Sequence, residues 1–236
     1  LKIMFKGQPK GLYALAIANT GERFGYYTML AIFMLFLQAK FGYDGKVASQ
    51  IYGIFLAAVY FMPVLGGWLA DKIGFGKCVV TGISVMFLGY LCLAIPTPAS
   101  TLGLMLMLLA LLLIAVGTGL FKGNLQVITG NLYDDPKYSA RRDSGFSLFY
   151  MAINIGAMFA PSAATAITNN FLAKAGLVYK ADVPALAHQC LGGSADAAAK
   201  PQAYMGQMPG QDIVGTMDPA AFSNYYIEHL STAYNM

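Results

Sequence analysis

The chain has 236 residues, of which 57% are hydrophobic and only 11% are charged, and its mean hydropathy is +0.57. Soluble domains carry roughly 25% charged and about 45–50% apolar residues, so this composition argues against a water-soluble monomer. Three dispersed cysteines exclude a disulfide scaffold. A net charge of +4 without a basic cluster argues against nucleic acid as a partner. The lipid bilayer is the expected surrounding.

Five apolar segments are long enough to cross a membrane, because a spanning helix needs about 20 mostly apolar residues. In chain order they are residues 12–39, 47–70, 78–95, 102–131 and 144–173. The sequence therefore predicts an all-α, polytopic membrane bundle over residues 1–175. Residues 176–236 contain no run long enough to span and are expected to form an extramembrane segment.

The basic residues of the loops predict an orientation. On one side of the expected bundle they are Lys2, Lys6, Lys10, Lys72, Lys77, Lys137, Arg141 and Arg142. The other side holds Lys40 and Lys46. Since positive charge collects on the cytoplasmic side, the N-terminus is expected in the cytoplasm and residues 176–236 outside.

The segment 176–236 is expected to contain one short amphipathic helix, over residues 222–234. Its two histidines, His188 and His229, are expected to be solvated surface residues. Five is an unusual number of spans for a transporter, and Leu1 is not an initiator methionine. The chain is therefore expected to be part of a longer one that continues past Met236.

One helix face within the first span is polar. The residues concerned are Asn19, Glu22, Arg23, Tyr26 and Tyr27. The first four follow the i, i+3, i+4, i+7 spacing of a single helix face, which Tyr27 extends. A charge at the bilayer centre costs about 2.5–3.5 kcal/mol on insertion scales, so this face is expected to line a wet or protein-filled interior.

Two readings of these charges are open. Glu22 and Arg23 could be a structural ion pair that locks helices together. Lys122, in the fourth span, adds a second cation against one carboxylate. This excess favours a site for an anionic ligand group.

Other polar residues within or near the spans are less specific. Tyr150 and Asn154 are four residues apart and share a face of the fifth span, where interhelical hydrogen bonding is an equally ordinary explanation. Tyr60 in the second span could simply pack. Asp71 follows the second span and could be a latch or a solvated loop charge.

Four segments form an ordered set of motifs. They are GERFGYY at 21–27, GGWLADK at 66–72, GTGLFKGN at 117–124, and 146–158, which contains F-x-x-F-Y-x-x-I-N-x-G. Together they resemble the proton-dependent oligopeptide transporter family, a branch of the major facilitator superfamily. The resemblance covers residues from about 11 to 175. Residues 176–236 stand where that family connects its fifth and sixth helices, and look like an insertion.

The resemblance implies twelve helices in two halves around a central cavity, of which this chain would hold five. Its partners would be small peptides, the bilayer and the remaining helices, 6–12. Arg23 and Lys122 would bind the carboxylate of the peptide, and Glu22 would carry the coupled proton. Asp71 would belong to a gating loop. The other substrate-binding residues would be Tyr26, Tyr27, Tyr60, Tyr150 and Asn154. No metal and no cofactor besides the proton as coupling ion is implied.

Two positions depart from the family pattern. Asn19 stands where the family has its first glutamate and cannot carry a proton. Leu30 stands where a cation is common. Both changes reduce the usual charge network.

Three functions remain in view. The first is proton-coupled symport of di- and tripeptides. The second keeps the fold but carries another small anion, such as nitrate or an organic acid. The third is a non-transporting membrane receptor or scaffold, against which the retained intramembrane charges argue. An enzyme is not expected, because no second intramembrane acid, Cys–His pair or metal-ligand cluster accompanies Glu22.

Overall fold

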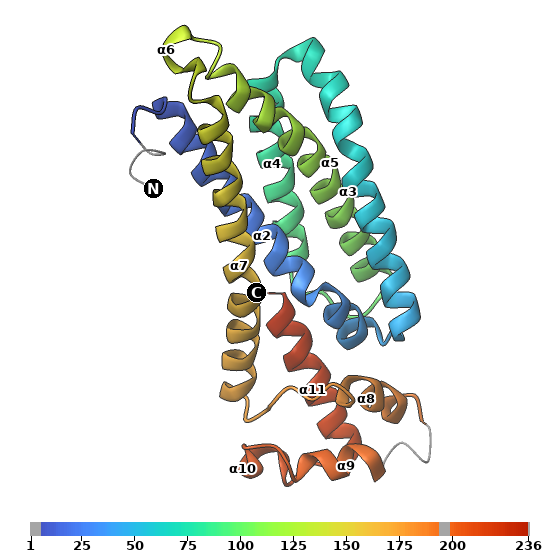
Figure 1. The fold of residues 1–236 in the computed structure, drawn as a ribbon. Helices are drawn as coiled ribbons and strands as arrows, with labels where there is room; N and C mark the ends of the chain where they lie inside the picture. Colours follow the sequence, from blue (N-terminus) through green and yellow to red (C-terminus); the bar gives the residue numbers. More distant parts are fainter. Residues whose placement is uncertain (1–5, 194–198, 236) are drawn as a thin grey trace. The chain divides into compact units, whose positions relative to one another are not determined.

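The computed structural model describes residues 6–193 and 199–235, so Lys2 and Met236 lie outside the described residues. Throughout this described part the regular elements are helices (Figure 1). The six helices before the C-terminal segment are α2 (Lys10–Phe41), α3 (Gly45–Ile73), α4 (Phe75–Ala94), α5 (Thr101–Asn131), α6 (Pro136–Ser139) and α7 (Arg142–Lys174).

Five of these helices, α2, α3, α4, α5 and α7, are long and apolar enough to cross a membrane. The expectation of an all-α bundle with five spans is thereby confirmed. All five helices begin one to three residues before the expected segments, because helical hydrogen bonding continues into the flanks, whereas α4 ends at Ala94, one residue before its expected end. Helix α3 ends at Ile73, three residues beyond the expected end.

The contacts divide the chain into two compact units, which are described separately. The first unit comprises Leu1–Thr28, Gly53–Leu93 and Leu104–Pro161. The second unit comprises Met29–Tyr52, Ala94–Gly103 and Ser162–Met236. The division into a bundle of residues 1–175 and a segment of residues 176–236 remains a prediction.

Glycines allow close helix packing in the first unit. A Cβ added at Gly82 of α4 would lie 2.8 Å from the carbonyl oxygen of Gly117 in α5. A Cβ at Gly117 would in turn lie 2.7 Å from the carbonyl oxygen of Gly82. Asn124 of α5 donates a hydrogen bond to the carbonyl oxygen of Gly66 in α3, at 3.2 Å. Small residues and interhelical hydrogen bonds are the usual means of packing helices in membranes.

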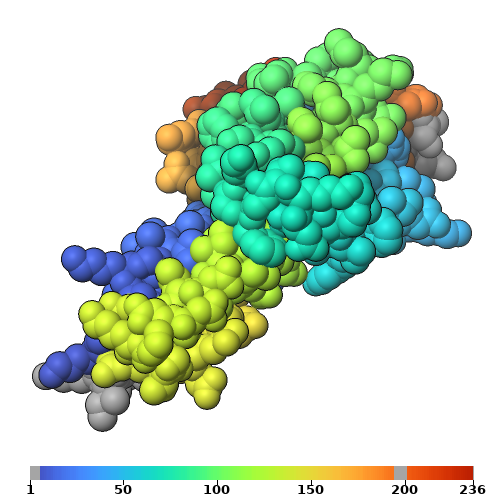
Figure 2. All heavy atoms as spheres, turned by 90° about the horizontal axis from the view of Figure 1, so that it is seen from above, coloured from blue at the N-terminus to red at the C-terminus, as the bar shows by residue number. Residues whose placement is uncertain are grey.

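A polar network attaches the start of the chain to the α5–α7 connection. The Tyr133 hydroxyl donates to Gln8 Oε1 at 2.8 Å, and Gln8 Nε2 donates to Ser144 Oγ at 2.9 Å. Arg141 also donates to the carbonyl oxygen of Lys6. Figure 2 shows the blue N-terminal segment beside the yellow-green connection. The network fixes the entry into α2.

The second unit contains the helices α8 (Val183–Leu191), α9 (Ala199–Met205), α10 (Gln211–Val214) and α11 (Pro219–Tyr234). Helix α11 packs against α8 and α9. It begins at Pro219 because Asp218 caps it, accepting a hydrogen bond from the Ala221 N–H at 2.8 Å. Phe222, Tyr226 and Leu230, spaced four residues apart, form its buried face. The expected amphipathic helix is confirmed.

Tyrosine hydroxyls attach α11 to the chain that follows α7. Tyr225 donates to the carbonyl oxygen of Ala175 at 3.1 Å, and Tyr226 donates to that of Val178 at 3.2 Å. Tyr226 also accepts a hydrogen bond from the Lys180 N–H at 2.9 Å. Burial raises the pKa of Tyr226 to about 12, so the hydroxyl remains a donor at physiological pH.

Both histidines of the C-terminal segment are half-buried, and each ring also has a backbone partner. His188 Nε2 lies 2.8 Å from the carbonyl oxygen of Ala39, at the end of α2. His229 Nδ1 lies 2.9 Å from the carbonyl oxygen of Tyr225, and the two rings are 4.0 Å apart. The fold of the second unit gives each ring a backbone partner, which the sequence alone does not show.

Candidate functional site

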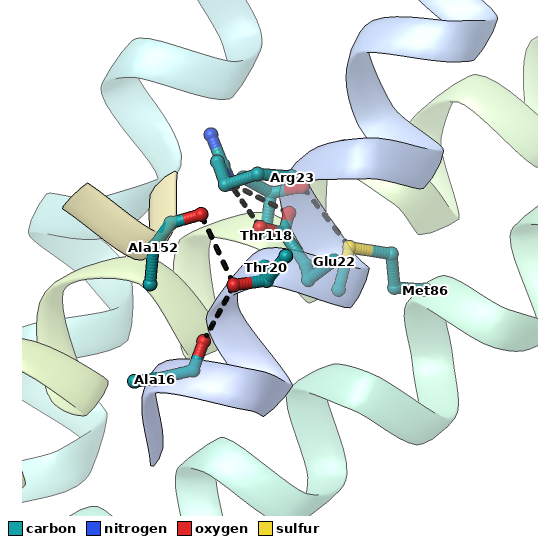
Figure 3. A network of polar contacts seen from close by, with 7 residues as sticks. All are labelled: Ala16, Thr20, Glu22, Arg23, Met86, Thr118 and Ala152. Carbon is teal, nitrogen blue, oxygen red and sulfur yellow. Dashed lines mark hydrogen bonds and ion pairs between the residues drawn. The ribbon is translucent and has the colours of Figure 1, made fainter. Parts of the chain in front are cut away.

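An ion pair lies within α2, in the first unit. The guanidinium of Arg23 contacts both carboxylate oxygens of Glu22: Nε bonds to Oε2, and Nη2 bonds to Oε1 at 2.5 Å (Figure 3). Only 5% and 4% of the two side chains are exposed. A bidentate pair of this kind gives each carboxylate oxygen one charge-assisted hydrogen bond without a second helix.

Helix α7 approaches α2 one turn away from this pair. The Thr20 hydroxyl lies between two carbonyl oxygens, that of Ala16 in its own helix at 2.9 Å and that of Ala152 in α7 at 3.0 Å (Figure 3). Gly156 allows the contact, since a Cβ there would lie 2.5 Å from the Thr20 carbonyl oxygen. Thr20 thereby places α7 beside the polar face of α2.

A cavity of about 150 Å³ adjoins Arg23 in the first unit. Its lining consists of Asn19, Arg23, Tyr27, Lys122, Gln126, Phe149 and Ile153. Helices α2, α5 and α7 each contribute residues. The polar face of α2 therefore faces a protein-lined interior, as the sequence pattern predicts.

Two cations share this cavity with aromatic rings beside them. The Lys122 ammonium nitrogen lies 5.0 Å from the centre of the Tyr60 ring, and Cζ of Arg23 lies 4.9 Å from the centre of the Tyr26 ring. Aromatic faces attract cations at these distances. With Glu22 as the paired acid, the three intramembrane charges sum to one positive charge.

Asn19 contributes an unused donor to the same cavity. Its side chain is 5% exposed, and among the residues that the structure describes its Nδ2 atom has no hydrogen-bond partner. A buried donor without a partner is costly, which makes this amide a candidate contact for a bound acceptor. The arrangement can bind an anionic group that also accepts hydrogen bonds.

Tyr150 and Asn154 lie apart from this cavity. Both line an open hollow of about 350 Å³ along α7, with Ser147 and Met158 among their neighbours. Phe149 and Ile153, which directly precede Tyr150 and Asn154 in the sequence, line the cavity beside Arg23 instead. One residue turns a helix by about 100°, because a turn holds 3.6 residues, which separates the two pairs.

Asp71 lies in the last turn of α3, where its side chain is exposed and does not line the cavity. Its neighbour Lys72 lies over the Trp68 ring, with the ammonium nitrogen 3.7 Å from the ring centre. The structure thus brings together Arg23, Tyr27 and Lys122 and adds Tyr60 and Tyr26 through their rings. The roles of all these residues remain predictions.

Sequence reasoning missed Gln126, Phe149 and Ile153 as cavity residues. Gln126 could have been found, since it stands four residues after Lys122 and shares its helix face. The two apolar residues gave no signal. Within the described ranges, no group of three or more His, Cys, Asp or Glu residues could hold a metal ion.

Several known proteins are similar in sequence to part of this chain. A profile described as the POT family matches residues 76–180. An uncharacterized transporter, YclF, from Bacillus subtilis (strain 168) is 40% identical over 165 residues. A di-/tripeptide transporter from Lactococcus lactis subsp. lactis (strain IL1403) is 38% identical over 165 residues. Each alignment covers 66% of this chain and 32% of the relative, so the chain spans about a third of these curated relatives.

Solved structures share the fold. A peptide transporter POT in complex with sulfate is 32% identical, with a TM-score of 0.62, over 91% of this chain and 41% of that one. A POT family transporter in complex with 5-aminolevulinic acid is 25% identical, also with a TM-score of 0.62, over 98% of this chain and 38% of that one.

Proposed function

We propose that this chain, which belongs to the POT family, forms part of a proton-coupled symporter of di- and tripeptides in a bacterial cytoplasmic membrane. The observation that carries the proposal is the shared cavity of Arg23 and Lys122. The name of the Lactococcus relative, a di-/tripeptide transporter, supports peptides as the cargo. Helices 6–12 of the expected twelve would come from the rest of the transporter.

The two cations suit the terminal carboxylate that every peptide possesses. Guanidinium forms paired hydrogen bonds to a carboxylate, and an ammonium adds a compact charge with three donors. Asn19 offers a further donor to the same group. A carboxylate entering this cavity would balance the excess positive charge that Glu22 leaves.

Proton coupling follows from competition for Arg23. In the structure Glu22 occupies the guanidinium of Arg23 in a bidentate pair. Protonation of Glu22 would remove its charge and release the guanidinium for the carboxylate of the peptide. Glu22 would then carry the coupled proton, and the released Arg23 would bind the cargo. This coupling does not require a titratable group at Asn19.

The remaining predicted contacts would complete the site with the missing helices. Tyr60 is 69% exposed and Tyr150 49% exposed in this chain, and Asn154 is exposed as well. Polar groups of this kind would be covered by a second half across a central cavity. Together with Tyr26 and Tyr27 they would contact the backbone of the peptide, which all peptides share whatever their side chains. Asp71 would act in a cytoplasmic gating loop.

The proposed topology has the N-terminus in the cytoplasm and residues 176–236 outside. It rests on the basic residues at the ends of the spans, such as Lys77 and Arg142. A proteolysis or cysteine-labelling experiment on intact cells would test it. Labelling of Cys190 from the outside only is expected.

A small anion, such as nitrate or an organic acid, is the second candidate cargo. The cavity of about 150 Å³ is small, and Asn154 is not among its lining residues. A sulfate complex is known for a structural relative. These observations suit a compact anion as well as a peptide carboxylate.

Uptake into proteoliposomes decides between these functions. The protein encoded by the whole reading frame is reconstituted, and uptake of labelled dialanine is measured with and without an inward proton gradient. Accumulation driven by the gradient is expected. Uptake of nitrate or an organic acid in place of dialanine would support the second cargo.

Replacement of Glu22 tests the coupling. In the Glu22→Gln variant we expect accumulation driven by the gradient to disappear, while exchange of labelled for unlabelled dialanine continues. The charge of Arg23 remains, so the carboxylate site is retained. Driven accumulation that persists in this variant would show that the coupled proton is bound elsewhere.

A further inference from the structure

A second cavity lies within the second unit, at the end of α2. It has a volume of about 430 Å³, within the range of about 300–1,000 Å³ typical of small-molecule sites. Residues from the end of α2, the connection 96–99 and helix α11 line it. None of these residues belongs to the cavity of Arg23, so this inference is independent of the proposed function.

Lys40 provides a buried cation in this second cavity. The side chain is 4% exposed, and its ammonium nitrogen donates a hydrogen bond to Thr97 Oγ1 at 2.9 Å. The rings of Phe36 and Phe41 lie 5.1 and 5.9 Å from the same nitrogen. Among the described residues no carboxylate lies within 4.0 Å of it. A buried ammonium with only neutral neighbours is costly, so an anionic partner would stabilise it.

Helix α11 supplies complementary groups on the other wall. The side chain of Glu228 lines the cavity and is exposed, beyond ion-pair distance from Lys40. Ser231 Oγ and Asn235 Oδ1 are buried, and within the described ranges neither atom has a hydrogen-bond partner. Both residues line the same cavity. The walls therefore present one cation, one anion and two unused polar groups to the same space.

The geometry points to a binding site for a small zwitterion, a free amino acid or a short peptide, in this cavity. The carboxylate of the ligand binds the Lys40 ammonium, and its ammonium group faces Glu228. Asn235 Oδ1 accepts a hydrogen bond from the ligand, and Ser231 can donate or accept one. A ligand with both charges pairs with Lys40 and with Glu228, whereas an ion of one sign pairs with only one of them.

Binding of four small probes to the full-length transporter in detergent tests this site by titration calorimetry. The probes are alanine, dialanine, N-acetylalanine and alaninamide. Alanine or dialanine is expected to bind at least about tenfold more tightly than N-acetylalanine, which lacks the ammonium, and alaninamide, which lacks the carboxylate. In the Lys122→Gln variant, in which the proposed transport site is weakened, the tighter of the two zwitterions identifies the source of the ligand. Equal affinity for all four probes would overturn the proposal.

Matched variants locate the binding. Lys40→Gln is expected to weaken zwitterion binding by about tenfold or more, and Glu228→Gln to weaken it by a smaller factor. Lys46→Gln removes an exposed charge near the same helix end, and Lys122→Gln changes the cavity of the first unit. Both are expected to leave alanine binding unchanged. If Lys40→Gln has no more effect than Lys46→Gln, the site does not exist. If only Lys122→Gln weakens binding, the zwitterion binds at the cavity of the proposed transport site instead.

Discussion

The two buried cations of α2 are held in opposite ways. Arg23, in the first unit, is neutralised by its sequence neighbour Glu22 through a bidentate pair. Lys40, in the second unit, has a hydroxyl and two rings as neighbours. A buried charge with a fixed counter-charge is strongly dependent on that partner, whereas a charge with neutral neighbours is stabilised weakly and can gain from a ligand. On the proposed transport mechanism Arg23 exchanges its partner, whereas in the proposed zwitterion site Lys40 acquires one.

Loss of each cation should therefore affect stability differently. Arg23→Gln leaves the buried carboxylate of Glu22 without its partner, and we expect a loss of about 3–5 kcal/mol, the cost of breaking a buried pair from one side. Lys40→Gln leaves only the hydroxyl of Thr97 and should cost much less. Thermal unfolding of both variants in detergent measures the difference. Equal losses would contradict the expected difference between the two cations. Adding Glu22→Gln to the Arg23→Gln variant should restore part of the stability.

Helix packing offers a second contrast, between two glycines of α5. Gly117→Ala would place a Cβ 2.7 Å from the backbone nitrogen of Met86, and overpacking of this kind typically costs about 1–3 kcal/mol. Gly123→Ala is the matched control, since among the described residues no atom beyond its chain neighbours and the adjacent backbone of its own helix lies within 4 Å of the added Cβ. The midpoint of thermal unfolding should fall for the first variant and stay or rise for the second. A similar fall in both variants would show that the contact at Gly117 does not cause the loss, since helix propensity alone favours alanine over glycine.

The second unit should be sensitive to a helix cap. Asp218→Ala removes the acceptor for the Ala221 N–H at the start of α11, and a lost N-cap costs about 1 kcal/mol. Asp212→Ala, on the exposed side of α10, is the control. Hydrogen exchange of the α11 amides should rise in the first variant only. Unchanged exchange would show that the tyrosine contacts hold α11 without its cap.

The sequence predicted much of the first unit because its signals are local. Apolar runs fix the spans, and the spacing of Asn19, Glu22, Arg23 and Tyr26 fixes a polar face. Arg23 and Lys122 were expected to meet, and they line one cavity. The spans and the polar face needed only helix geometry and the cost of burying charge, whereas the joint role of Arg23 and Lys122 was implied by the resemblance to a known family.

Other features depend on how helices are rotated and packed. Phe149, and not Tyr150, lines the cavity, because the contact of Thr20 with α7 fixes the rotation of that helix. The cavity of Lys40 arises from the folding of α11 onto distant parts of the chain, and nothing in the local sequence indicates it. His188 gains a backbone partner in the same way.

The position of Glu22 and Arg23 next to each other in one helix has a thermodynamic consequence. Partners on different helices could be separated by a rocking motion, but these two move as one body. On the proposed mechanism, proton and peptide affinity are then linked locally: the factor by which a bound carboxylate tightens proton binding equals the factor by which the proton tightens peptide binding. That reciprocity would hold in every orientation of the transporter, so the direction of transport would be set by the two concentration gradients alone.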